Sequence, residues 1–179
     1  MDLIFRNDDV CANTDINDLH DSFYLPLHDK YPDAKIYSCV TLFSKKSESG
    51  SVYPDVPFKD KPLEYFLSVD RFLGRYMAPD YVTTVSHGAW HFDHSALSKE
   101  AQYCSIISSC AILKTRIFCP PFNRWSSDTE AICNDNGIQL LKMEDGWKSL
   151  EHNKFDKNHG LFYFHSWRWK SKEFMEYIE

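Results

Sequence analysis

Short apolar runs alternate along this chain with longer stretches in which apolar residues recur every three to four positions. The short runs predict strands at residues 3–5, 35–43, 81–85, 116–119, 138–143 and 160–165. The longer stretches predict helices that pack on those strands. Strands that alternate with helices form mostly parallel sheets, because each crossover helix returns the chain to the same end of the sheet. The pattern therefore predicts an α/β fold with a mostly parallel sheet or barrel, and not a sandwich.

Capping residues and prolines predict where the helices begin and end. The first helix should begin after Asn13 or Thr14, and Pro26 within it should cause a kink or an end, with a break near Tyr24. The remaining helices are expected at 62–73, at 98–114 with Ser98 as the cap, from Ser126 or Ser127 to Gly137, and at 171–178.

The segment 44–61 shows neither periodicity. It is polar and contains Gly50, Pro54 and Pro57, so it is predicted to be the longest irregular stretch of the chain. Loops of this length in a compact domain often form lids or substrate-facing walls, and a loose loop is the alternative.

Length and charge limit the organisation and the partners of the protein. The 179 residues suffice for one domain with a core, so a single domain over 1–179 is expected. The 20 Lys and Arg against 26 Asp and Glu give a net charge of −6, which disfavours nucleic acid as a partner. The many aromatic residues can build a dense core and also supply flat surfaces of the kind that pack on sugar rings.

The cysteines and the apolar runs indicate a cellular compartment. The six cysteines form no CxxC pair, so reduced and mostly buried thiols are expected. The N-terminus has no basic leader before an apolar region, and no apolar run is long enough to cross a membrane. We therefore expect a cytoplasmic protein with no membrane span. The sequence leaves the oligomeric state unknown.

Three histidines within eight residues form the densest chemical cluster. His87 and His91 are four residues apart, which on a helical turn places both rings on one face with Cβ atoms about 6 Å apart. His94 is an alternative to His91, because a loop can present either ring. The best third ligand comes from Asp8 and Asp9, which follow the first predicted strand. Two histidines and one carboxylate with an open position form the ligand set of hydrolytic metal sites.

Four clusters in chain order carry a resemblance to a known family. They are Asp8-Asp9, His87-Gly88-Ala89-Trp90-His91, Cys119-Pro120-Pro121-Phe122 and Tyr163-Phe164-His165. They are similar to the Asp-Asp, His-x-x-x-His, Arg-x-Pro-Tyr and Leu-x-His motifs of the polysaccharide deacetylases, the NodB-homology group or carbohydrate esterase family 4. The resemblance extends over nearly the whole chain and implies a deformed (β/α) barrel of mostly parallel strands.

The resemblance implies a role for the residues of the first, second and last cluster. Asp9, His87 and His91 would hold one divalent metal ion, Zn²⁺ in the first instance and Co²⁺ or Ni²⁺ as alternatives. Asp8 would be the catalytic base. His165 would protonate the leaving amine.

Further residues would contact the substrate or support the catalytic groups. Pro121 and Phe122 would border the substrate, and the backbone N–H of Phe122 would stabilise the tetrahedral oxyanion, a contribution of roughly 3 kcal/mol. Phe122 replaces the Tyr of the family, which keeps the backbone donor and loses a hydroxyl group. Trp147 would form a wall of the pocket, and Asp145 would orient His165.

One departure concerns the base itself. Cys119 stands where the family usually has an Arg that holds the base carboxylate, and Arg6, Arg116 and Arg124 are the candidate substitutes. Asn7 precedes the Asp pair, where many relatives have a nonpolar residue. The chain is also shorter than most catalytic domains of the family, which indicates trimmed loops or a missing strand.

Structural interpretations stand beside the functional ones. Asp8 and Asp9 taken alone are typical of a turn at a strand end or of a helix cap. His165 lies in the aromatic run 162–169 and also fits a core histidine that ends a buried strand. Cys119 fits an inert buried thiol better than an extra metal ligand.

Three functions are therefore distinguished. The first is a metal-dependent hydrolase that removes an acetyl or similar acyl group from an N-acetylated sugar or glycan. The second is a catalytically degenerate relative that binds carbohydrate without turnover. The third is a domain with a purely structural metal, whose coordination shell would be closed and whose removal would unfold the chain.

Overall fold

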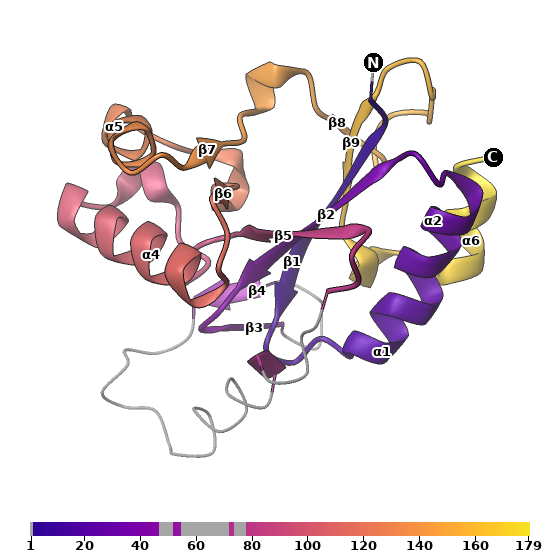
Figure 1. The fold of residues 1–179 in the computed structure, drawn as a ribbon, viewed down its shortest axis with the longest axis horizontal. Coiled ribbons are helices and arrows are strands. Elements are labelled where there is room, and N and C mark those ends of the chain that lie inside the picture. The colour runs from indigo at the N-terminus through magenta and orange to yellow at the C-terminus, as the bar shows by residue number, and fades with distance from the viewer. Residues whose placement is uncertain (1, 47–51, 55–71, 74–77) are drawn as a thin grey trace.

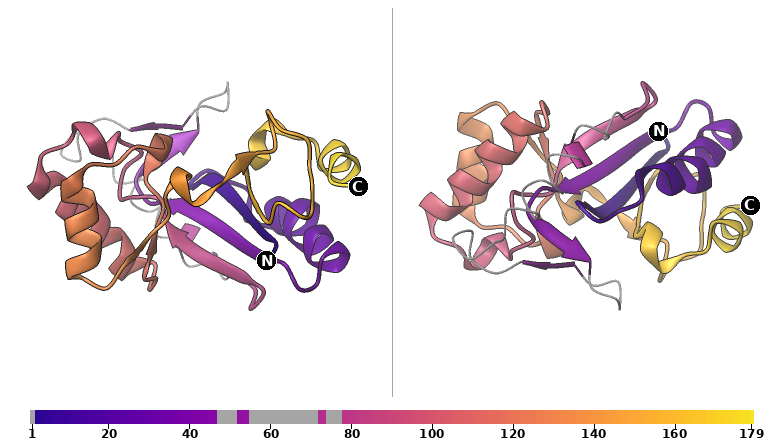
Figure 2. Two further views of the ribbon diagram at one scale, coloured as in Figure 1. Left: turned by 90° about the horizontal axis from the view of Figure 1, so that it is seen from above. Right: turned by 90° about the horizontal axis from the view of Figure 1, so that it is seen from below.

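A seven-stranded sheet forms the centre of the molecule (Figure 1). The computed structural model describes residues 2–46, 52–54, 72–73 and 78–179. The strand order is β7-β6-β5-β2-β1-β9-β8, and every pair of neighbours is parallel. The strands are β1 (Ile4–Cys11), β2 (Lys35–Thr41), β5 (Val82–Ser86), β6 (Ile117–Phe118), β7 (Gln139–Leu140), β8 (Lys148–Ser149) and β9 (Leu161–Phe164). The sheet curls into an open half-barrel, so the predicted deformed (β/α) barrel is confirmed (Figure 2).

Two groups of helices lie against the outside of this sheet (Figure 1). One group lies near β1 and β9, and the other lies at the β6–β7 end of the sheet. The first group contains α1 (Ile16–Leu19), α2 (Leu25–Lys30) and α6 (Ser171–Tyr177), and the second contains α4 (Lys99–Ile112) and α5 (Ser127–Asp135). Among the described residues, no helix is both long enough and apolar enough to span a bilayer.

Alternation along the strands separates an outer core from an inner one. Ile36 and Val40 of β2 belong to the cluster under α1, α2 and α6, whereas Cys39 belongs to a cluster on the opposite face. This inner cluster, which the curl of the sheet encloses, also contains Cys119 and Trp147. Because side chains alternate with period two, one strand supplies both cores.

Each strand predicted from the sequence is present, and the helix caps are mostly those predicted. Ser98 accepts a hydrogen bond from the N–H of Ala101 and begins α4. Ser126 begins α5 in a capping box with Thr129. The first cap was predicted wrongly, because the carboxylate of Asp15, and not Asn13 or Thr14, accepts the free N–H groups of the first turn.

The predicted break near Tyr24 is also wrong in form. A π-helical segment, His20–Tyr24, joins α1 to α2, and the helix continues to Lys30. The N–H of Leu25 bonds to the carbonyl of His20, five residues earlier. This wider turn allows Pro26, which lacks an N–H, to sit in the first turn of α2 without ending the helix.

Two further expectations are modified. The segment 44–61 is not wholly irregular, because β3 (Ser44–Lys46) and β4 (Val52–Pro54) pair as a small antiparallel ladder. Most of the helix expected at 62–73 lies outside the described residues. Strand β8 was not predicted, because its two residues, Lys148 and Ser149, are polar and belong to no apolar run.

Asn7 explains why a polar residue precedes the Asp pair. Its side chain is fully buried on the outer face of β1, where its Nδ2 donates to the hydroxyl of Tyr24 at 3.0 Å and to that of Ser166 at 3.2 Å. Its Oδ1 accepts the backbone N–H of Ser166 at 2.9 Å. Asn7 therefore joins the central strand to the first helix and to the segment after β9.

We expect Asn7→Ala to lower the free energy of unfolding by about 2–4 kcal/mol, because it leaves the buried N–H of Ser166 without its acceptor. Urea denaturation monitored by circular dichroism measures the change. Asn158→Ala, at an exposed turn, is the matched control and should change the midpoint little. Equal effects of the two substitutions would contradict the assigned role of Asn7.

Candidate metal and catalytic site

The central strand β1 places two carboxylates at one edge of the inner core. Arg6 and Asp8 are two residues apart and therefore share the inner face of β1. The pairing of β1 with β2 shifts register between Asn7 and Val10, and Asp9 in this bulge has a positive φ of 65°. Asp tolerates this left-handed conformation better than most residues. The bulge turns Asp9 toward the histidines, although strict alternation would point it away from Asp8.

The two histidines come from the loop after β5, and not from the helical turn that the sequence suggested. His87 directly follows the strand, and Gly88 has a φ of 88°. A Cβ at Gly88 would lie 2.9 Å from the carbonyl oxygen of Trp90, so the turn requires glycine. The turn returns His91 to His87, with ring centroids 5.2 Å apart. The N–H of His91 donates to the hydroxyl of Ser44 at 2.9 Å.

Asp9, His87 and His91 bring three potential ligand atoms to one point. The Oδ1 of Asp9 lies 2.8 Å from Nε2 of His91 and 3.3 Å from Nε2 of His87, and the three ligand atoms lie within 4.8 Å of one another. The Nδ1 of His87 lies 2.7 Å from the carbonyl oxygen of Cys119. A carbonyl only accepts, so Nδ1 carries the proton and Nε2 presents a lone pair. This second contact is typical of metal-ligating histidines.

The electrostatics of these groups favour a positive charge between them. Burial raises the pKa of Asp9, but hydrogen bonds from His87 and His91 lower it well below its usual value. Burial lowers the pKa of His87, yet the Asp9 carboxylate raises it well above its usual value. A proton or a cation is therefore stabilised at the same place. The residues present fit a divalent cation.

His94 does not belong to this group. It is fully buried, with Nδ1 3.0 Å from the carbonyl oxygen of Phe92 and Nε2 3.2 Å from the hydroxyl of Ser105. Burial lowers its pKa to about 4, so it is a neutral core histidine. Of the two candidates for the second histidine ligand, His91 is the one beside Asp9.

Asp8 is held by an arginine from its own strand. The Nη2 of Arg6 donates to Oδ2 of Asp8 at 2.9 Å and to Oδ1 of Asn123 at 2.8 Å. Arg6 is fully buried, and its guanidinium lies 4.7 Å from the ring centre of Trp147 and 4.9 Å from that of Tyr163. Of the three candidate arginines, Arg6 is therefore the one that holds the Asp8 carboxylate.

The other two candidate arginines make contacts elsewhere. Arg116 donates to the carbonyl oxygen of Asn136, and Arg124 pairs with Asp93 at 3.0 Å. The two-residue spacing between Arg6 and Asp8 was the sequence signal that could have selected Arg6, because it places both side chains on one strand face.

His165 follows β9 and is oriented by a carboxylate that was not predicted. Its Nδ1 lies 2.9 Å from Oε1 of Glu151, and its backbone N–H donates to the same oxygen at 2.8 Å. Burial lowers the pKa of His165, but Glu151, Asp9 and Asp8 together raise it above its usual value. Asp145, the residue predicted for this task, instead accepts the backbone N–H of Lys142. The Nε2 of His165 lies 3.7 Å from Oδ2 of Asp9.

A cavity of about 200 Å³ opens over these groups. Six residues predicted from the sequence line it, namely Asp8, Asp9, His87, His91, Phe122 and His165, together with three that were not predicted, Asn123, Trp167 and Arg168. The aromatic run 162–169 had suggested a core role as the alternative for His165, which instead lines the cavity. The guanidinium of Arg168 lies 4.7 Å from the ring centre of Trp167, which presents an aromatic surface at the rim.

Two of the predicted substrate contacts lie away from the cavity. Trp147 is only 6% exposed and packs in the inner core against Arg6, because its place after the turn at Gly146 directs it inward. Pro121 is buried, whereas Phe122 is 54% exposed and lines the cavity. The backbone of Phe122 has a positive φ of 57°. Its N–H has no hydrogen-bond partner in the described part of the chain.

Comparison with known proteins gives a likeness of structure alone. No family model and no curated protein matches the sequence. A family 4 carbohydrate esterase from Streptomyces lividans, solved with acetate, has a TM-score of 0.59 at 10% identity, over 99% of this chain and 84% of its own. The peptidoglycan N-acetylglucosamine deacetylase Bc1960 has a TM-score of 0.51 at 10% identity, over 92% of this chain and 70% of its own.

A protein described as a pseudoenzyme is also similar in structure to this chain. BA3943 of Bacillus anthracis, a pseudoenzyme of carbohydrate esterase family 4, has a TM-score of 0.56 at 11% identity over 91% of this chain. The match covers 54% of that protein, so this chain spans about half its length. At these identities the comparison establishes the fold, and it does not distinguish an enzyme from an inactive relative.

We expect Ni²⁺ to raise the melting temperature of the protein, and a concentration of 100 times the Kd corresponds to about 2.7 kcal/mol of stabilisation. The shift should vanish in Asp9→Asn and His91→Ala and persist in His94→Gln, the matched control. Binding should weaken as the pH falls, because the ion must displace the proton that the raised pKa of His87 retains. Loss of binding in His94→Gln alone would contradict the ligand set.

We expect Arg6→Met to destabilise the fold by about 3–5 kcal/mol, because it leaves the buried Asp8 carboxylate without its partner. Lys35→Met removes an exposed ion pair with Asp2 and serves as the control, for which little change is expected. Thermal unfolding of both variants measures the difference. Equal melting temperatures of the two variants would contradict the stabilising role of the buried pair between Arg6 and Asp8.

Proposed function

Because the chain has the fold of the family 4 carbohydrate esterases, we propose that it is a divergent relative of them and a metal-dependent hydrolase. The reaction is removal of an acetyl or similar acyl group from an N-acetylated sugar or glycan. One observation carries the proposal, namely that Asp9, His87 and His91 converge on a cavity that Asp8 and His165 also line. Binding residues alone would not need two further titratable groups beside the ligands.

The ligands suit a single divalent cation, of which Zn²⁺, Co²⁺ and Ni²⁺ are the candidates. When bound, the ion supplies Lewis-acid chemistry, which lowers the pKa of water from 15.7 toward about 7 and polarises a carbonyl group. Asp9, His87 and His91 hold it at the wall of the cavity and leave the open side to water and substrate. A purely structural metal would need a closed shell, whereas these three residues border open space.

Asp8 is the proposed general base. Its Oδ2 is occupied by Arg6, while Oδ1 is buried and has no hydrogen-bond partner among the described residues. Oδ1 is therefore the oxygen that accepts the proton of the attacking water. The pair with Arg6 fixes the orientation of the carboxylate, as a base requires.

His165 is the proposed general acid. Glu151 accepts from its Nδ1, so the other ring nitrogen, Nε2, faces the cavity. The raised pKa of His165 keeps the imidazolium form available near neutral pH. Nε2 then donates its proton to the leaving nitrogen as the C–N bond breaks.

Phe122 is proposed to stabilise the tetrahedral oxyanion. Phe122 lines the cavity directly after Pro120 and Pro121, two prolines that restrict the backbone, and its N–H is free to donate. A preorganised donor of this kind contributes roughly 3 kcal/mol to the transition state. The aromatic surface of Trp167 at the rim suits the face of a sugar ring.

The second candidate is a carbohydrate-binding relative without turnover. Its support is Cys119, which replaces the usual arginine, together with the structural likeness to a pseudoenzyme. The pair between Arg6 and Asp8 weakens this candidate, because it restores the missing partner of the base. Glycan binding with no acetate release at any metal concentration would support it.

We expect the wild-type protein, loaded with Zn²⁺ or Co²⁺, to release acetate from a member of a panel of N-acetylated sugars and oligosaccharides. Asp8→Asn should lower the rate by roughly 10²–10⁴-fold and leave metal binding intact, because it removes the base and keeps the ligands. His87→Ala should lose both. Acetate assay and metal analysis of each variant are the measurements.

His94→Gln is the control for that experiment, since this buried histidine bonds to Phe92 and Ser105 and is not among the residues that line the cavity. Its activity should equal that of the wild type. Full activity in Asp8→Asn would remove the proposed mechanism, and absence of turnover in the loaded wild type over the whole panel would favour the binding protein.

A further inference from the structure

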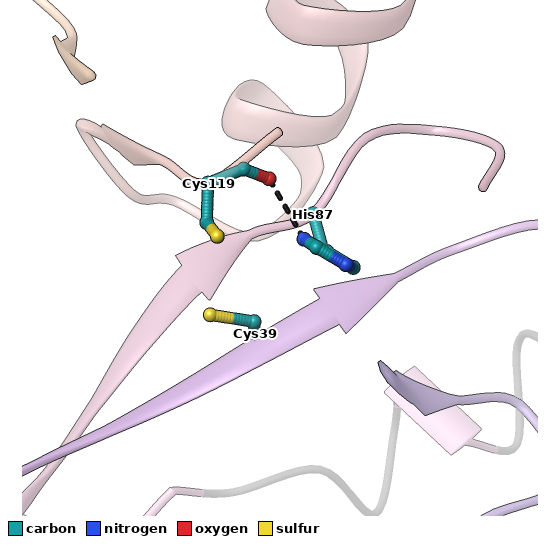
Figure 3. A group of neighbouring side chains, drawn as sticks. All are labelled: Cys39, His87 and Cys119. Carbon is teal, nitrogen blue, oxygen red and sulfur yellow. Dashed lines mark hydrogen bonds between the residues drawn. The ribbon is translucent and has the colours of Figure 1, made fainter. Parts of the chain in front are cut away.

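A second group of potential ligands lies on the other side of His87 (Figure 3). Cys39 comes from β2 and Cys119 follows β6, and both side chains are fully buried in the inner core. Both cysteines are free thiols. The two sulfur atoms and one ring nitrogen of His87 lie within 4.8 Å of one another. Figure 3 shows the two sulfur atoms one above the other, to one side of the imidazole ring.

His87 separates this thiol pair from the cavity. Its Nε2 faces Asp9, at 3.3 Å, and its Nδ1 faces Cys119, at 2.7 Å from the carbonyl oxygen. A neutral imidazole has one N–H and one lone pair. The lone pair can therefore serve the cavity or the thiols, but not both at once.

Arg6 supplies an independent sign that an anionic group is expected beside the cysteines. Its Nε and Nη1 are buried and have no hydrogen-bond partner among the described residues. The guanidinium is close enough to act electrostatically on both Cys39 and Cys119. Unpartnered donors of a buried cation are costly, and two thiolates would accept from them.

We propose that Cys39, Cys119 and Nδ1 of His87 form a second metal site, selective for a thiophilic divalent d¹⁰ cation. Thiolate ligands favour such ions over hard ones. Bonds to such an ion are about 2.3 Å from sulfur and about 2.0 Å from nitrogen, so the three ligand atoms, within 4.8 Å of one another, would surround it once Nδ1 leaves the carbonyl oxygen of Cys119. Two thiolates neutralise a divalent cation, so binding adds no net charge to the core.

Binding of the cation releases protons from the thiol site. Each thiol releases one proton to solvent when its sulfur binds the cation. Nδ1 of His87 gives up its proton when it binds the cation, and the ring proton that remains is on Nε2, where it faces the carboxylate of Asp9. No oxidant or reductant takes part.

The two sites share His87, so their occupants compete. A cation held by the thiol pair uses Nδ1 and leaves Nε2 protonated, which removes one ligand from the Asp9, His87 and His91 group. A thiophilic ion would thus weaken binding at the first site through the tautomer of a single ring. This consequence rests on the proposed function of the first site, whereas the existence of the thiol site does not.

Cadmium titration of the reduced full-length chain tests the thiol site. A Cys104→Ser background removes the exposed thiol, which could otherwise bind the ion. We expect about one equivalent of Cd²⁺ to produce the ultraviolet charge-transfer absorption of a cadmium–thiolate bond. Cys39→Ser and Cys119→Ser should each reduce the affinity at least tenfold. Cysteines that only fill the core would give no absorption with substoichiometric Cd²⁺, which would overturn the proposal.

Two variants serve as controls. Cys110→Ser changes a buried thiol in a different cluster, the one that contains Cys133, so this variant should keep the cadmium–thiolate absorption. Loss of the absorption in Cys110→Ser would overturn the proposal. His91→Ala should also keep it, because His91 serves only the first site. Circular dichroism checks each fold, and Cys39→Ala, which buries no hydroxyl group, replaces a serine variant that fails to fold.

Competition between the two metal sites is measured by metal binding, without an assay of activity. Preloading with one equivalent of Cd²⁺ should weaken Ni²⁺ binding at least tenfold in the Cys104→Ser protein and leave it unchanged when Cys39→Ser is added. Cadmium–thiolate absorption with no acetate release from the zinc-loaded wild type would leave the thiol site standing and reject the hydrolase. Acetate release without the cadmium–thiolate absorption would support the hydrolase and reject the thiol site.

Discussion

The burial of three charged side chains within four residues of the central strand is the constraint on which this structure depends. Arg6, Asp8 and Asp9 are each less than 10% exposed. An isolated charge at such depth would cost several kcal/mol, so each must have a partner. Arg6 pairs with Asp8, and Asp9 pairs with the imidazoles of the loop after β5. The strand can occupy the middle of the sheet only because its neighbours supply these partners.

The same constraint explains the local backbone. Period-two alternation places Arg6 and Asp8 together on the inner face, but it would turn Asp9 outward into the apolar core of α1, α2 and α6. The bulge after Asn7 and the positive φ of Asp9 bring the second carboxylate to the cavity as well. Two adjacent acidic residues thereby reach one site, and Val10 returns to the outer core.

Arg6 holds Asp8 from within the same strand, so position 119 can carry a small buried thiol. That thiol lies close to Cys39 and to the Nδ1 side of His87. Packing in the inner core thus links the orientation of the Asp8 carboxylate, the hydrogen bonding of His87 and the placement of two cysteines.

The sequence by itself determined the α/β class, the six strands that contain an apolar run, the caps at Ser98 and Ser126, and the pairing of one of the two early carboxylates with the histidine cluster. These features follow from periodicity and from motif order, which are local or additive. Only the tertiary structure decided between His91 and His94, selected Arg6 and Glu151 as partners, and placed Trp147 in the core and Trp167 on the cavity. Such choices depend on the curl of the sheet and on loop geometry, because residues far apart in the chain meet there and no local pattern records their contact.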